Sequence, residues 1–84
     1  FKISQYEKAL TCFFEAIKVY SYYQINYNIA LCYIKLDNLD HAKFYLYEVV
    51  KSNKNFFFSY YNLIRINLKT NNISDAYLMY KDFS

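Results

Sequence analysis

Apolar side chains recur every three or four positions in five successive segments of this chain. This spacing places the apolar side chains of each segment on one face of an α-helix. Because the polar segments between them are only about two to five residues long, consecutive helices should be antiparallel neighbours. We expect these helices over residues 5–19, 23–36, 39–51, 57–69 and from residue 73 onward.

Polar residues mark the points where the helices should begin and end. Ser4 and Glu7 have the spacing of a capping box, in which the serine hydroxyl accepts from the backbone and the glutamate reaches back. Residues 37–38, 52–55 and 70–72 form the later connections. The chain has no Gly and no Pro. This argues against tight hairpins and phosphate-binding loops, whereas helices can still be closed by Asn or Asp.

The apolar stripe of each helix defines the side that should be buried. In the first helix the stripe runs from Tyr6 to Tyr20 and includes Phe13. Side chains at these positions should fill the space between neighbouring helices. The residues expected to be buried in the second, third and fourth helices are Ile25, Ile29, Ala30, Tyr33 and Leu36, then Leu39, Ala42, Leu46, Val49 and Val50, then Tyr60, Leu63, Ile64 and Asn67.

One segment of about ten residues repeats along the chain. Residues 37–46 match residues 71–80, because each has a polar pair, an aliphatic residue, a second polar pair and an alanine. Ala76 of the later copy follows Ala42 of the earlier one by 34, and Ala9 in a third copy precedes Ala42 by 33. A period in this range indicates stacked supersecondary units in place of a single compact core.

The repeating unit resembles the tetratricopeptide repeat (TPR), a helix–turn–helix unit of about 34 residues. Its clearest copy has Ile29-Ala30 and Tyr33 on the first helix, and Ala42 with Leu46 on the second. In such repeats the alanines permit close helix contact, and the larger side chains fill the space between helices. The residues that fit the pattern here are therefore interpreted as packing residues, including Phe13 and Tyr80.

The resemblance implies an all-α fold, in which antiparallel helix–turn–helix repeats stack as a right-handed α-solenoid of about two and a half TPR units. The last unit departs from the pattern, because Ile64 replaces a small residue and Asn67 replaces the tyrosine. We expect the chain to be part of a longer array. The implied domain covers residues 1–84, with the second helix of one repeat at 4–20, a repeat at 22–55 and a truncated repeat at 56–84.

Composition and charge narrow the range of functions. The net charge is +3, and no run of five like charges indicates a nucleic-acid-binding tail. No apolar stretch has the roughly 18 residues that a membrane-spanning helix needs, so we expect no membrane span. Two cysteines without a secretory context indicate reduced thiols, and we expect an intracellular, cytoplasmic location. The 12 Tyr and 8 Phe supply ample apolar surface to bury.

Few side chains here are suited to catalysis or to metal binding. His41 is the only histidine, and an exposed position in the first turn of a helix explains it better than a metal site. Cys12 and Cys32 lie on neighbouring helices and are expected to be free, buried thiols. Asp37 and Asp40 are explained as residues at a helix start. We therefore expect no enzymatic activity, no cofactor and no metal.

Matching side chains on the second and fourth helices form a candidate binding surface. The resemblance implies that the first helices of successive units line the concave face of the solenoid. Asn side chains can donate to and accept from a peptide backbone, Tyr rings provide rigid contact area, and basic groups favour an acidic partner. The candidate peptide-binding residues are Gln24, Tyr27, Asn28, Leu31 and Lys35, followed by Phe58, Tyr61, Asn62, Arg65 and Lys69.

These observations favour a protein–protein interaction scaffold that binds a peptide or a helix within a larger assembly. The alternative is single-stranded RNA binding, because residues 61–64 followed by Ala76 also resemble a pentatricopeptide repeat. Spacings of 33 and 34 disfavour that interpretation, as does Phe57 where a polar residue is expected. Self-association, or stacking of the exposed ends on further repeats, is a third possibility.

One TPR subclass grips the C-terminal carboxylate of heat-shock chaperones with a clamp of Lys, Asn and Arg. Asn28 matches one member of that clamp. Phe58 and Asn62 stand where the later Lys and Arg are expected. The resemblance therefore does not support binding of chaperone tails.

Overall fold

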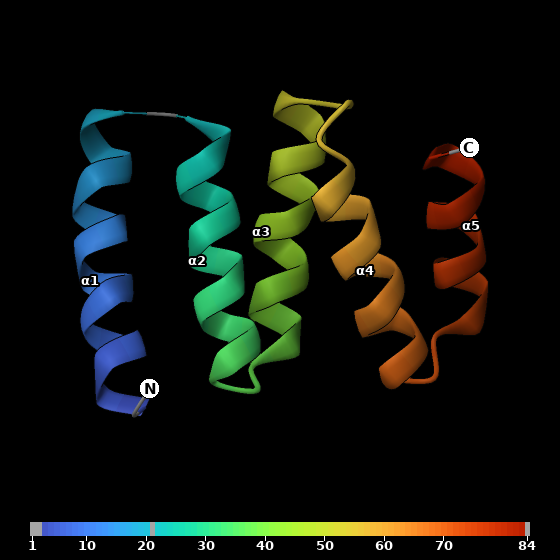
Figure 1. The fold of residues 1–84 in the computed structure, drawn as a ribbon, viewed down its shortest axis with the longest axis horizontal. Coiled ribbons are helices and arrows are strands. Elements are labelled where there is room, and N and C mark those ends of the chain that lie inside the picture. The colour runs from blue at the N-terminus through green and yellow to red at the C-terminus, as the bar shows by residue number, and fades with distance from the viewer. Residues whose placement is uncertain (1–2, 21, 84) are drawn as a thin grey trace.

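The computed structural model describes residues 3–20 and 22–83 of the chain. These residues form α1 (Ile3–Val19), α2 (Tyr23–Lys35), α3 (Leu39–Ser52), α4 (Phe57–Lys69) and α5 (Ile73–Phe83). The helices stand side by side, and consecutive helices run in opposite directions (Figure 1). The described residues contain no strand, so the all-α prediction is confirmed. Their Cα atoms span 34 × 26 × 16 Å.

The helix boundaries follow the polar segments of the sequence closely. Four of the predicted helix starts, at residues 23, 39, 57 and 73, coincide with the observed ones. The prediction for the first helix was wrong at its start: α1 begins at Ile3, so Ser4 lies inside the first turn and is not its N-cap. The side chain of Ser4, and with it the predicted capping box, lies outside the described residues. At α3 the Asn38 side chain does act as the cap, accepting from the backbone N–H of His41 at 3.4 Å.

The same backbone closure ends α2 and α4. Asp37 and Asn71 have φ angles of 60° and 67°, in the left-handed region that Gly usually occupies at a helix end. Directly after Asp37, the N–H of Asn38 donates to the carbonyl of Tyr33 at 2.8 Å, and Asn72 makes the equivalent bond at 2.7 Å. These six-to-one bonds define the Schellman motif, which satisfies carbonyls that the helix would otherwise leave unpaired.

Replacing Asp37 with glycine should raise the free energy of unfolding by about 0.5–1 kcal/mol, because glycine has no Cβ to oppose a positive φ. The ion pair lost, between Lys69 Nζ and Asp37 Oδ1 at 3.9 Å, contributes little because both side chains are mostly exposed. Urea denaturation of Asp37→Gly measures the gain. Asp37→Ala is the control: it keeps the Cβ and should lower stability, so an equal gain in both variants would contradict the prediction.

The extent of contact differs from one pair of neighbouring helices to the next. The most extensive contacts join α2 to α3 and α4 to α5, while the α1–α2 and α3–α4 contacts are smaller. Alternate helices also touch: the ring centroids of Phe14 on α1 and Tyr45 on α3 are 6.2 Å apart. Tyr27 on α2 and Asn62 on α4 are joined by a hydrogen bond. Consecutive helices therefore pack against each other, and α1 also touches α3, as α2 touches α4.

The buried residues form two clusters. Ala30, Ala42, Leu46, Leu63 and Ile66 make the larger one, which joins α2, α3 and α4. The smaller cluster, between α1 and α2, contains Leu10, Ile29 and Cys32. The partly buried rings of Tyr33 and Tyr45 pack against both clusters. Seven residues predicted to be buried are fully inaccessible to solvent: Ile29, Ala30, Ala42, Leu46, Val49, Leu63 and Asn67.

Three expectations about burial were wrong. Cys12 is exposed, because it lies on the outer side of α1. Tyr20 follows the end of α1 and stacks on Tyr22 at 5.8 Å between ring centroids, with 55% of its surface exposed. Tyr80, expected to fill the space between helices, is 60% exposed on α5. The repeat pattern thus predicted the burial of interior helices better than that of the ends.

Alkaline pH should weaken the fold partly through Tyr45. Burial, and secondarily the nearby Tyr33, raises the pKa of Tyr45 above its ordinary value of 10.0. The folded state therefore holds this proton more tightly than the unfolded state, and the resulting stability is lost as pH rises through the raised pKa. The free energy of unfolding, measured in urea between pH 9 and 11, should fall less steeply for Tyr45→Phe than for the wild type. Tyr22→Phe, at an exposed ring, should retain the wild-type slope; equal slopes in all three proteins would refute this assignment.

Candidate peptide-binding groove

The candidate residues lie along α2 and α4, as their spacing predicted. Leu31 is partly buried, and so are Tyr27 and Asn62, which bond to each other. The outward stripes of α2 and α4 therefore meet and are not two separate surfaces. The candidate residues that are exposed are Gln24, Asn28 and Lys35 on α2, with Phe58, Tyr61, Arg65 and Lys69 on α4.

The Asn62 side chain is fixed by two hydrogen bonds. Its Nδ2 donates to the Tyr27 hydroxyl at 3.0 Å and to the Phe58 carbonyl at 2.9 Å. Because a backbone carbonyl only accepts, the atom facing Phe58 must be the amide nitrogen. Both donor hydrogens are used inside the protein, so the Asn62 carbonyl oxygen is what remains for a ligand. The expectation that this amide both donates to and accepts from a peptide is therefore wrong for Asn62.

Aromatic packing closes one end of the space between α2 and α4. The Phe56 ring lies 4.8 Å from the Tyr27 ring, edge to face, and 5.1 Å from the Tyr23 ring, measured between centroids. Such edge-to-face pairs add to the stability gained from buried area. Tyr27 therefore supports the α2–α4 contact and offers a ligand less ring surface than the sequence pattern predicted.

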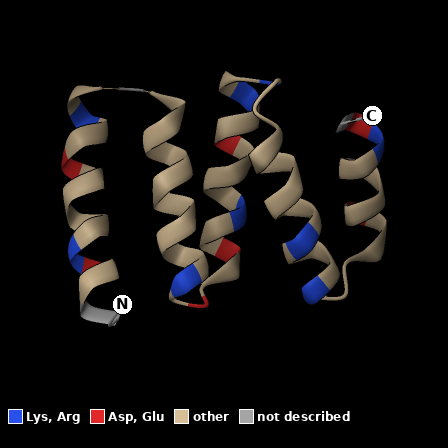
Figure 2. Ribbon diagram, viewed as in Figure 1, with Lys and Arg blue, Asp and Glu red and all other residues tan. Residues whose placement is uncertain are grey.

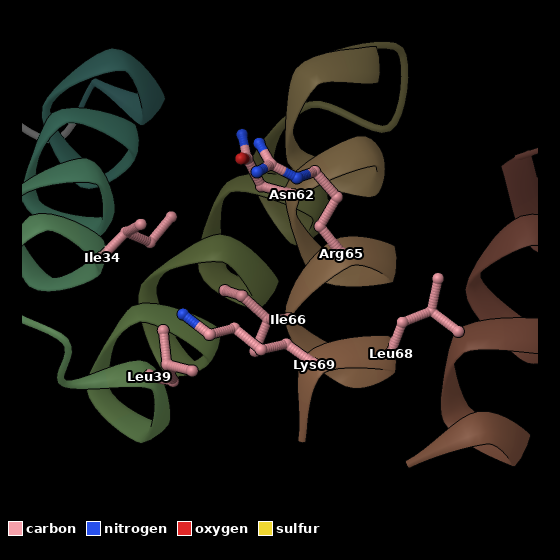
Figure 3. Close-up of a pocket in the computed structure, with 7 residues that line it drawn as sticks. All are labelled: Ile34, Leu39, Asn62, Arg65, Ile66, Leu68 and Lys69. Atoms are coloured by element: carbon pink, nitrogen blue, oxygen red, sulfur yellow. The ribbon is translucent and has the colours of Figure 1, made fainter. Parts of the chain in front are cut away.

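A hollow of about 310 Å³ opens further along the same two helices. Figure 3 shows Ile34 of α2 and Leu39 of α3 facing Ile66 and Lys69 of α4, with Asn62 and Arg65 next to each other along α4. Leu68 also lines the hollow, but its side chain extends toward α5 (Figure 3). We call this hollow the α2–α4 groove; its lining residues are Ile34, Leu39, Asn62, Arg65, Ile66, Leu68 and Lys69.

The sequence predicted the polar residues of this groove but missed its apolar ones. Asn62, Arg65 and Lys69 were among the candidates, whereas Ile34 and Ile66 were assigned to neither face, and Leu39 was assigned to the core. Ile34 and Ile66 flank the expected stripes on their helices. A groove between two helices is lined by residues at the border between the buried and the exposed face of each helix. That rule could have identified these two residues from the sequence.

Basic side chains dominate the charge around the groove. Figure 2 shows Lys or Arg near the lower ends of both α2 and α4. The Arg65 guanidinium lies 5.5 Å from the centroid of the Tyr61 ring, which holds it by a cation–π contact. Lys69 is 3.9 Å from Asp37 in an exposed, weak ion pair, and Lys35 is exposed with no ion pair among the described residues. The groove thus combines an apolar wall with a positively charged rim.

The other candidate side chains do not form a reactive site. His41 Nδ1 is 2.9 Å from Asn38 Oδ1, and its ring packs 5.0 Å from that of Tyr33. Burial raises the pKa of the Cys32 thiol, which disfavours the reactive thiolate, and Cys12 is a free thiol on another face. Asp40 lies in the first turn of α3, as predicted. Within residues 3–20 and 22–83, no group of three or more His, Cys, Asp or Glu side chains could hold a metal.

No protein-family model, no curated protein and no solved structure matches this chain. Among the described helices, none has the length and apolar character needed to cross a membrane.

Proposed function

We propose that this chain is a TPR-like α-solenoid module that serves as a protein–protein interaction scaffold. Two features support it: the repeat period in the sequence, and the matching left-handed closures at Asp37 and Asn71, which are one repeat period apart. The extensive contacts within α2–α3 and within α4–α5 fit two helix–turn–helix units. In this arrangement α2 and α4 are the first helices of successive units, which line the binding surface of a solenoid.

The observation that carries the binding function is the α2–α4 groove. An apolar side chain of a ligand would lie against Ile34, Leu39 and Ile66, where water is displaced from apolar surface. Carboxylates beside that side chain would pair with Arg65 and Lys69 at the rim. The free carbonyl oxygen of Asn62 would accept from a peptide N–H. The proposed ligand is therefore an extended peptide segment with an apolar residue flanked by acidic residues.

Selection from a random-peptide display library tests this proposal. Enriched peptides should combine acidic residues with an apolar residue, and their binding should weaken as salt rises. Arg65→Glu should reduce the affinity of an enriched peptide at least about tenfold, because it places like charges together in the groove. Lys8→Glu, which reverses an exposed charge on α1, is the matched control and should leave the affinity unchanged.

Two results would contradict the proposal. Enrichment of peptides without acidic residues, or equal effects of Arg65→Glu and Lys8→Glu, would exclude the groove as the site. Submicromolar binding of single-stranded RNA that weakens steeply between two salt concentrations would instead favour the pentatricopeptide-like alternative.

A further inference from the structure

The hydrogen bond between Asn62 and Tyr27 determines which polar groups remain for a ligand at one end of the α2–α4 groove. Asn62 Nδ2 lies 3.0 Å from the Tyr27 hydroxyl and 2.9 Å from the Phe58 carbonyl, so both of its hydrogens are used. Because an amide nitrogen only donates, the Tyr27 hydroxyl oxygen must be the acceptor in the first bond. The hydrogen of that hydroxyl is therefore directed away from Asn62.

The Tyr27 hydroxyl hydrogen and the Asn62 carbonyl oxygen form a neighbouring donor and acceptor. Within the described part of the chain, nothing accepts from this hydroxyl and nothing donates to Asn62 Oδ1. The described side-chain polar atoms that are fully buried without a partner belong to Ser59 and Asn67, so Asn62 Oδ1 is not fully buried. Since Oδ1 and Nδ2 share one carbon atom, this acceptor lies close to the hydroxyl that Nδ2 contacts. The pair thus offers one donor and one acceptor to the same ligand group.

We propose that the Tyr27–Asn62 pair binds an amide of the groove ligand, donating from Tyr27 to the amide oxygen and accepting at Asn62 Oδ1 from the amide N–H. A carboxylate has no hydrogen to donate, and a hydrocarbon has neither group. The bond from Asn62 polarises the Tyr27 hydroxyl and strengthens its donation. This inference rests on the proposed function and adds a third group to the apolar and acidic residues of its ligand.

Two parts of a peptide can supply such an amide. One is the side chain of Gln or Asn, whose oxygen and nitrogen are bonded to one carbon. The other is the backbone of one residue in an extended segment, whose N–H and C=O point to the same side, as in an antiparallel strand pair. Both present a donor beside an acceptor, and the peptides described below distinguish them.

The order of side chains along α4 sets the spacing of the ligand groups. Asn62 precedes Ile66 by four residues and Lys69 by seven, which correspond to about 6 Å and 10 Å along a helix axis. Figure 3 shows the same order, with Asn62 and Lys69 toward opposite ends of the groove. An extended peptide advances about 3.3 Å per residue. The amide should therefore lie about two residues from the apolar side chain that contacts Ile66, with an acidic residue one or two positions further.

Water competes with the ligand for the Tyr27–Asn62 pair. A water molecule can accept from the Tyr27 hydroxyl and donate to Asn62 Oδ1, so a ligand group that displaces water must reproduce both bonds. An amide reproduces them, whereas an apolar group of similar size leaves both protein atoms unpaired. The affinity ratio between an amide and its apolar counterpart is therefore the quantity that this inference predicts.

Three short peptides measure that ratio. The first is acetyl-Asp-Gln-Ala-Leu-Ala-Asp-amide, the second has Met in place of Gln, and the third is N-methylated at Gln. Each is made in both sequence orders, because α4 does not fix the direction of the ligand. The wild type should bind the first peptide at least about tenfold more tightly than the second or the third, since two hydrogen bonds are lost. Loss with Met identifies the side-chain amide, and loss with N-methylation identifies the backbone.

Two variants of the protein test the assignment to this pair. Asn62→Leu removes the acceptor and Tyr27→Phe removes the donor, so each should lower the tenfold ratio to about threefold, the value expected for one remaining hydrogen bond. Tyr61→Phe is the matched control: it removes the hydroxyl of a 59% exposed ring, keeps the ring against Arg65 and should leave the ratio within about twofold. A ratio taken on one protein is insensitive to its folded fraction, so a merely structural role would not change it.

The outcomes separate this inference from the proposed function. A ratio unchanged in Asn62→Leu or in Tyr27→Phe overturns the inference, and so does a wild type that binds all three peptides equally. If Arg65→Glu still weakens binding in those experiments, the proposed function stands without it. If none of the peptides binds, or if Arg65→Glu leaves their binding unchanged, the proposed function fails and this inference fails with it.

Discussion

Leu46→Ala is expected to destabilise the fold by about 2–5 kcal/mol, the largest loss among the changes considered. The Leu46 side chain is fully buried in the larger cluster, where it packs with Ala30 and Leu63 from two other helices. Truncation removes apolar contacts and leaves a cavity that rigid helices fill only in part. A folded chain of 84 residues typically has about 4–13 kcal/mol of stability in total, so this loss is a substantial fraction of it.

Urea denaturation followed by circular dichroism measures the effect. Leu68→Ala is the matched control, because Leu68 is also on a helix but 55% exposed. Leucine and alanine have similar helix propensities, so the control should change stability by less than about 0.5 kcal/mol. A loss for Leu46→Ala no greater than that of the control would show that the larger cluster does not stabilise the fold.

Asn67→Leu is expected to raise the free energy of unfolding by about 1–3 kcal/mol. Asn67 is completely buried on α4, and neither its Nδ2 nor its Oδ1 has a hydrogen-bond partner. Leucine has the same branching and no polar atoms, so it removes an uncompensated desolvation cost and adds apolar contact. Ser59, two turns earlier on the same side of α4, is likewise buried with its hydroxyl unpaired, so the interior of this helix carries two such costs.

Asn28→Leu provides the comparison, because Asn28 is exposed on α2. A surface substitution of this kind should alter stability by less than about 0.5 kcal/mol. The midpoint of urea denaturation should therefore rise for Asn67→Leu and stay nearly constant for Asn28→Leu. A fall in the midpoint for Asn67→Leu would show that the buried amide is satisfied by internal water, which leucine would displace.

The helices and their boundaries could be predicted from the sequence because local chemistry decides them. Polar residues at 37–38 and 70–72 end one helix and start the next, and the left-handed conformations of Asp37 and Asn71 suit those residue types. Ala42 and Ala76 are buried, as their place in the repeat pattern predicted. These features depend on residue type and on spacing along the chain, both of which the sequence displays directly.

The details of the groove could not be predicted, because they depend on how far α2 and α4 approach each other. The hydrogen bond between Asn62 and Tyr27 joins residues 35 positions apart, and it turns two expected ligand contacts into structural ones. The same approach brings Ile34 and Ile66 into one hollow. Side-chain spacing on a single helix contains no information about a distance between two helices.

The positions of Tyr33 and Tyr45 determine which helices can unfold locally while the rest of the chain stays folded. Their rings stack 5.9 Å apart and pack against both buried clusters. The extensive contacts of α5 are with α4, whereas the smaller cluster, which contains Leu10 and Ile29, joins α1 to α2. Amide hydrogens of α5 should therefore exchange with solvent through local opening that leaves α1 and α2 folded, while those next to Tyr33 and Tyr45 should require global unfolding.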